Sequence, residues 1–110
     1  AYGHEGVLTP EHAFVAAANT CIMMMFLLAC QRFKLDLVSY ACRAEGTKRV
    51  ELDRTESFTH LRLFPEIVVR GADEKRVRRA LEAAQKYSLV ANSVKSEVTI
   101  EPEIVIVRDD

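Results

Sequence analysis

The chain has 110 residues, which fits one domain and leaves little room for a second. Hydrophobic residues make up 49% of the chain and charged residues 28%, a composition that argues against disorder and supports one real core. Fifteen basic and sixteen acidic residues give a net charge of -1, so no general attraction to nucleic acid is expected. Three cysteines without a metal-binding or CxxC spacing predict free thiols in a reducing compartment, and we expect a cytoplasmic protein.

An N-terminal helix is predicted from Pro10 to about residues 32–34. Thr9 is its expected N-cap, Pro10 occupies the first helical position, and Glu11 suits the positive end of the helix dipole. Residues 13–30 contain no charge, which reaches the lower limit for crossing a bilayer. Five alanines make the segment only moderately hydrophobic, and the central helix of a soluble core explains it better. We expect no membrane association.

Two strands should follow this helix and form a long hairpin. The first is predicted over residues 35–52, with a bulge at Gly46, and the second over residues 58–70. A polar turn at 53–57 joins them. Pro65 cannot donate a backbone hydrogen bond, so it indicates a bulge or an edge position within the second strand.

A second helix is expected after Asp73, its predicted N-cap. Its apolar residues recur at helical spacing, at Val77, Ala80, Leu81 and Ala84. A polar loop over 88–95 and a final strand over 97–107, with Pro102 at a bulge or edge, complete the chain. The prediction is one α+β domain over 1–110 with the order α-β-β-α-β, in which a long central apolar helix packs on an antiparallel sheet.

Two motifs resemble the OsmC/Ohr family of osmotically inducible and organic hydroperoxide resistance proteins. The first combines Gly3-His4-Glu5-Gly6, Pro10-Glu11-His12 and the small residues before Cys21, and the second is the stretch 81–93. The resemblance covers nearly the whole chain. It implies an intertwined homodimer that reduces organic or inorganic hydroperoxides through a cysteine, with an external thiol as reductant, and the N-terminal strands of the family are expected to be absent from this chain.

The resemblance also implies roles for three residues. Cys21 matches the reactive cysteine on the central helix, and Glu11 matches a glutamate near the start of that segment. Ser88 falls where the family has the second cysteine that closes a disulfide, so the resolving position is expected to be vacant. The arginine that activates the thiol in the family belongs to a region before the central helix, which we expect to be absent here.

The residues themselves leave simpler roles open. Desolvation in an apolar helix raises the pKa of a thiol, so Cys21 without a cation or donor is a packing residue. Glu11 stabilises the helix dipole and lies roughly 15 Å from Cys21 on a straight helix, so contact needs a helix break or a dimer partner. Cys30 should face the opposite side of the helix from Cys21, and Cys42 belongs to a strand.

Other functions have weaker support in the sequence. His4 and His12 flank the helix start without the further ligands of a metal site, so no metal or other cofactor is expected. The basic face of the second helix lacks a GxxG clamp or an aromatic platform and is expected to be solvated rather than to bind nucleic acid. The alternative to a peroxidase is a non-catalytic protein that binds a small apolar ligand in a pocket at the dimer interface.

Overall fold

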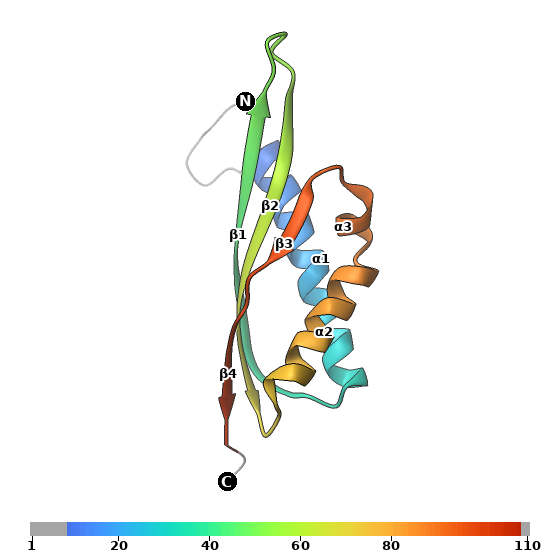
Figure 1. The fold of residues 1–110 in the computed structure, drawn as a ribbon, viewed down its shortest axis with the longest axis vertical. Coiled ribbons are helices and arrows are strands. Elements are labelled where there is room, and N and C mark those ends of the chain that lie inside the picture. Colours follow the sequence, from blue (N-terminus) through green and yellow to red (C-terminus); the bar gives the residue numbers. More distant parts are fainter. Residues whose placement is uncertain (1–8, 109–110) are drawn as a thin grey trace.

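The structure is a computed structural model that describes residues 9–108. Its elements are, in chain order, α1 (Pro10–Arg32), β1 (Asp36–Val50), β2 (Glu56–Arg70), α2 (Glu74–Tyr87), α3 (Leu89–Ser93), β3 (Glu97–Ile100) and β4 (Glu103–Val107). The three helices lie on one face of a four-stranded sheet (Figure 1), and the described part is elongated, with extents of 58 × 29 × 18 Å. The α+β class and the order α-β-β-α-β are confirmed.

The sheet is mixed rather than wholly antiparallel as the sequence analysis expected. β1 and β2 form the predicted antiparallel hairpin, but β3 and β4 both run parallel to β2. The reason is topological, because α2 carries the chain back along the sheet so that the next strand starts in the direction of β2. The final strand is also divided into two, with a break between Ile100 and Glu103.

The two prolines of the sheet meet at this break. Pro65 lies inside β2, opposite Cys42 of β1, and is fully buried. The Leu63 carbonyl accepts a hydrogen bond from the Glu101 backbone N–H on the other side of β2. Because strand residues alternate, the nitrogen of Pro65 faces that same side, where Pro102 interrupts the pairing. The expectation that Pro65 lies at a bulge or an edge is therefore wrong. The expected bulge at Gly46 is also absent, and the irregular pairings between β1 and β2 fall at Val38 and Thr59 instead.

α1 begins and ends where the sequence predicted. The Thr9 hydroxyl accepts the His12 backbone N–H at 3.2 Å, and the helix ends when Lys34 turns into the left-handed region at φ 55°. The N–H groups of Lys34 and Leu35 then bond back to the carbonyls of Gln31 and Cys30, the pattern of a Schellman cap. The helix runs without a break between these two ends.

α1 is apolar on both its inner and its outer face. Its inner face is buried against the sheet and α2, through Ala18, Ile22, Phe26, Ala29 and Cys30. Its outer face carries Met24, Leu27 and Leu28, which are 58%, 40% and 52% exposed. By length and composition α1 is able to cross a membrane, although its inner face packs as a core helix does.

α2 and the sheet complete the core. The Asp73 carboxylate accepts the Arg76 backbone N–H at 2.8 Å, as expected of the N-cap. The predicted apolar stripe of α2 is buried, and it faces the buried side chains of β2, which alternate along the strand at Leu61, Leu63, Pro65, Ile67 and Val69. The segment after α2 was expected to be a polar loop, but it contains the five-residue helix α3.

Gly46 supplies a test of the packing between the hairpin and α1. A Cβ atom at this position would lie 2.6 Å from a ring carbon of Phe58 and 3.1 Å from a methyl carbon of Val15. The Phe58 ring is itself stacked on Phe14, with centroids 5.0 Å apart. We expect Gly46→Ala to lower the free energy of unfolding by about 1 kcal/mol, measured by urea denaturation, because the added methyl group overpacks the half-buried contact with Phe58 and Val15.

A double-mutant cycle with Phe58→Leu is the control for this prediction. The smaller side chain of leucine leaves room for the new methyl group. Gly46→Ala should therefore cost less free energy of unfolding in the Phe58→Leu background than in the wild type. Equal costs in the two backgrounds would contradict the packing explanation.

Candidate functional site

The candidate site joins α1 to the junction between α2 and α3. Cys21 lies midway along α1 and is partly buried, whereas Ser88 is fully buried between the two shorter helices. The Ser88 hydroxyl donates a hydrogen bond to the Cys21 sulfur, with Oγ and Sγ 3.1 Å apart. The two residues are 67 positions apart in the sequence, so tertiary packing alone brings them together.

Ser88 is held in place by its position in the backbone. It ends α2, where its N–H bonds to the Gln85 carbonyl, and it is also the N-cap of α3. Its oxygen accepts the Ala91 backbone N–H at 3.2 Å. With that acceptor role filled by α3, the single hydroxyl proton is free to point at the sulfur. The same side chain therefore caps a helix and presents a donor to a thiol.

The Ser88 hydroxyl and backbone N–H groups of α3 lower the pKa of the Cys21 thiol. The Ser88 hydroxyl has the largest effect, followed by the backbone N–H of Val90; burial opposes them, and the Leu89 backbone N–H adds a smaller lowering. Hydrogen bonds to a thiolate favour the charged form and offset its desolvation. A reactive Cys21 was expected to need a cation or a hydrogen-bond donor nearby, and Ser88 and the start of α3 provide donors. A serine just before an apolar run is typical of an N-cap and was the available signal.

The two other cysteines lie away from this site. On an unbroken helix Cys30 is rotated roughly 180° from Cys21, and burial in the core raises the pKa of its thiol to about 11. Cys42 belongs to β1, where its carbonyl accepts a hydrogen bond from Asn19. Asn19 is rotated roughly 160° from Cys21 around the same helix. Burial is the largest influence on Cys42 and raises the pKa of its thiol.

Glu11 does not reach Cys21 within one chain. It is exposed in the first turn of α1, ten residues before Cys21 on a continuous helix, which separates them by roughly 15 Å along the axis. Glu11 instead lines a small cavity with Lys48, Gly46 and Phe58 at the end of the hairpin. The sequence left two ways for Glu11 to contact the thiol, a break in the helix or a contribution across a dimer. The helix is continuous, so only the contribution across a dimer remains.

The histidines do not gather into a metal site in the described part of the chain. His12 is exposed at the start of α1, His60 pairs with the Thr99 hydroxyl at 2.9 Å, and His4 lies outside the described residues. Within residues 9–108 no three histidine, cysteine or acidic side chains are placed to share a metal ion. The chemistry of the site rests on the thiol and its hydrogen-bond donors.

Removal of the Ser88 hydroxyl should raise the pKa of Cys21. A lowered pKa means that the thiolate is present at lower pH, so loss of the donor moves its formation to higher pH. In Ser88→Ala the pH profile of Cys21 alkylation by iodoacetamide, followed by peptide mass mapping, should shift upward, with rates converging at high pH. Loss of the α3 cap should also cost about 0.5–2 kcal/mol of stability.

Asn92→Ala is the matched control for this experiment. The Asn92 side chain donates to the Lys86 carbonyl at 2.8 Å and anchors the same segment without touching the thiol. Its removal should loosen α3 and leave the alkylation profile in place. Equal shifts in the two variants would show that the pKa depends on loop rigidity rather than on the hydroxyl.

Comparison with known proteins places the chain in a family. The sequence matches the family described as OsmC-like protein over residues 3–103, whereas no curated protein matches it. An OsmC-like protein of unknown function from Vibrio cholerae is 30% identical, with a TM-score of 0.79 over 93% of this chain and 67% of that chain.

Two more distant structures share the fold. An organic hydroperoxide resistance protein from Elizabethkingia anophelis is 15% identical, with a TM-score of 0.69 over 97% of this chain and 73% of that chain. Another from Legionella pneumophila is 14% identical, with a TM-score of 0.65 over 90% and 70%. The family match over most of the sequence is decisive, and the chain belongs to the OsmC family.

Proposed function

We propose that this protein acts in defence against oxidative stress, as a cytoplasmic, thiol-dependent reductase of organic or inorganic hydroperoxides with Cys21 as the attacking residue. Family membership and structural relatives named as organic hydroperoxide resistance proteins support the general role. The observation that carries the catalytic part is the hydrogen bond from Ser88 to Cys21 at 3.1 Å. It favours the thiolate, which is the nucleophilic form of cysteine.

The reaction follows from thiol chemistry. The Cys21 thiolate attacks the outer oxygen of the hydroperoxide, the O–O bond breaks, and the alkoxide takes a proton and leaves as an alcohol. Cys21 is thereby oxidised to a sulfenic acid. An external thiol condenses with it, releasing water and forming a mixed disulfide, and a second thiol then restores Cys21 and leaves as a disulfide.

Ser88 shapes the second half of this cycle. A serine hydroxyl forms no bond to sulfur comparable with a disulfide, although it lies within 3.1 Å of the Cys21 sulfur. Neither Cys30 nor Cys42 is on the same side of α1, so neither replaces the missing thiol. The sulfenic acid therefore depends on an external thiol and is open to further oxidation.

The proposed assembly is a homodimer, formed through the outer face of α1. Apolar side chains on this face are exposed in the single chain, and apolar patches of this kind mark interfaces. A partner placed here would also provide the remaining route by which Glu11 contributes to the site, where it would orient or polarise the bound peroxide. The homodimer and the contribution of Glu11 are both part of the proposal.

Turnover of cumene hydroperoxide with a dithiol reductant tests the reaction. Cys21→Ser should reduce the rate to that of buffer, because the attacking sulfur is lost, whereas Cys30→Ser should retain activity. An unchanged rate in Cys21→Ser would refute the assignment. In the wild type, one equivalent of peroxide should leave Cys21 as a sulfenic acid that dimedone traps, as read by mass spectrometry.

Ser88→Cys should restore an internal resolving thiol. After one equivalent of peroxide, peptide mapping should find a disulfide between Cys21 and the introduced thiol, because the side chains at these two positions already touch. The same variant in a Cys21→Ser background is the control and should form no such link. A native disulfide between Cys21 and either Cys30 or Cys42 would show that the resolving thiol is elsewhere.

Charges on the outer face of α1 should dissociate the dimer. We expect Met24→Glu with Leu27→Glu to convert a stable dimer into monomer or unfolded chain, measured by light scattering at micromolar concentration, since carboxylates are costly to bury in an apolar interface. Leu52→Glu is the control, since Leu52 is fully exposed in the hairpin turn. A folded wild-type monomer at this concentration would contradict the proposed assembly.

A further inference from the structure

The two halves of the candidate site are each held by the sheet. α1, which carries Cys21, packs on the sheet through its buried inner face. Ser88 lies at the end of α2, and its hydroxyl reaches the sulfur at 3.1 Å. Hydrogen bonds weaken steeply when their distance or angle departs from the optimum. The contact that fixes the end of α2 relative to the sheet therefore decides whether this hydrogen bond forms.

Gln85 joins the last turn of α2 to the sheet. Its side-chain amide donates to the Val98 carbonyl of β3, with Nε2 and the oxygen 2.9 Å apart. Val98 is aligned with Leu61 of β2, which is fully buried, so this part of β3 lies beside the core. Ser88 follows one turn later, and its backbone N–H bonds to the Gln85 carbonyl. Gln85 thus contacts β3 through its side chain and Ser88 through its backbone.

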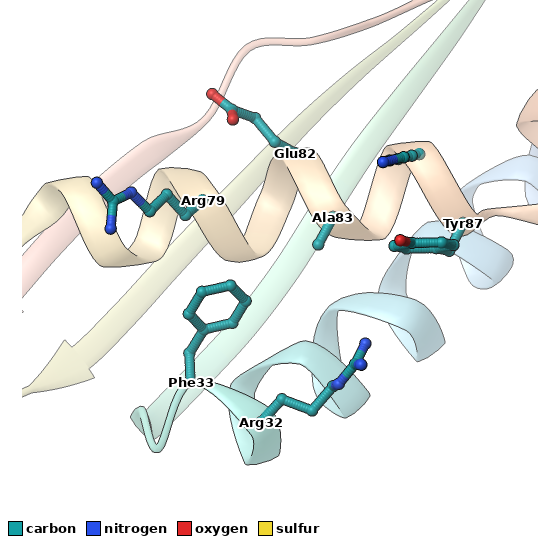
Figure 2. Close-up of a pocket in the computed structure, with 7 residues that line it drawn as sticks. Arg32, Phe33, Arg79, Glu82, Ala83 and Tyr87 are labelled. Carbon is teal, nitrogen blue, oxygen red and sulfur yellow. The ribbon is translucent and has the colours of Figure 1, made fainter.

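The next two side chains of this turn do not hold it against the sheet. Lys86 and Tyr87 are both exposed, whereas Gln85 is partly buried. In Figure 2 the Tyr87 ring lies on the side of α2 that faces the end of α1, where it lines a cavity with Phe33. Gln85 is rotated roughly 160° from Tyr87 around the helix. It is therefore the side chain of this turn that faces β3.

The hydrogen bond of Gln85 fixes the spacing here more than packing does. Gln85 lines a hollow of about 170 Å³ together with Leu81 of α2, Ile100 of β3 and Pro102 at the break before β4. Close-packed side chains would fix the separation of two elements by themselves, but beside this amide α2 and the edge of the sheet are not in close contact. Without the donor, the end of α2 has room to shift relative to β3.

Asn92 has a different effect on the same segment. Its side chain donates to the Lys86 carbonyl at 2.8 Å, and the Ala91 backbone N–H bonds to the Ser88 hydroxyl. Both contacts lie within the end of α2 and α3, so they keep this segment together without fixing its position on the sheet. The bond from Gln85 to β3 instead joins the segment to another element.

We propose that Gln85 is a positioning residue for the thiol, because its bond to Val98 holds the junction of α2 and α3 where the Ser88 hydroxyl reaches Cys21. This role rests on the proposed reaction, in which the Cys21 thiolate is the nucleophile. Among the described residues, the hydrogen bonds to the sulfur come from Ser88 and the start of α3. The effect of Gln85 therefore passes through Ser88, and Gln85 is not a catalytic residue.

Gln85→Met tests the proposal in the full chain, because methionine has a similar length and no donor. The pH profile of Cys21 alkylation by iodoacetamide should move upward, by part of the shift expected for Ser88→Ala, since the hydroxyl no longer favours the thiolate as strongly. Ser96→Ala controls for a general loosening of the fold. The Ser96 hydroxyl donates to the Phe58 carbonyl at 2.5 Å and ties the start of β3 to β2, so its loss should lower the stability and leave the profile in place.

A double-mutant cycle shows whether Gln85 acts through the hydroxyl. In a Ser88→Ala background, Gln85→Met should add little to the upward shift, because the group that it positions is already absent. The proposal would be overturned by an unchanged profile in Gln85→Met, by an equal shift in Ser96→Ala, or by a full second shift in the Ser88→Ala background. Alkylation requires no turnover, so a protein without peroxidase activity would contradict the proposed function, while the profile would still decide the role of Gln85.

Discussion

A continuous 23-residue helix fixes where the chemically relevant side chains of this protein lie. Because α1 has no break, each residue keeps the angular position that its number assigns to it. Cys21 falls at the border of the buried stripe, Cys30 falls inside the core, and Arg32 lies further along the stripe that carries Cys21. Packing of the inner face on the hairpin and α2 therefore sets the positions of the thiol and the outward apolar surface together.

The second constraint is the hydroxyl of Ser88. It accepts a backbone N–H of α3 and donates to Cys21, so the start of a short helix and the ionisation of a thiol depend on the same oxygen. This arrangement links the conformation of residues 88–93 to the reactivity of Cys21. In the proposed cycle it also separates two functions that a resolving cysteine would combine, because serine favours the thiolate but cannot trap its oxidised form.

The uneven covering of α1 explains why the site lies at a border. The sheet and α2 bury one side of the helix, whereas Met24 and Leu27 face outward. Cys21 lies between these regions and is partly buried. A thiol in such a place is partly desolvated and contacted by hydrogen-bond donors. The proposed homodimer would close the outward side.

The sequence by itself determined the features that depend on local interactions. The caps Thr9 and Asp73 are encoded within a few residues, so the starts of α1 and α2 and the buried stripe of α2 were predicted correctly, and the family resemblance marked positions 21 and 88. Only the tertiary structure decided what surrounds the thiol. The direction of β3 and β4 depends on the α2 crossover, α3 is too short for a helical pattern, and the contact of Ser88 with Cys21 joins residues 67 positions apart, where local periodicity carries no information.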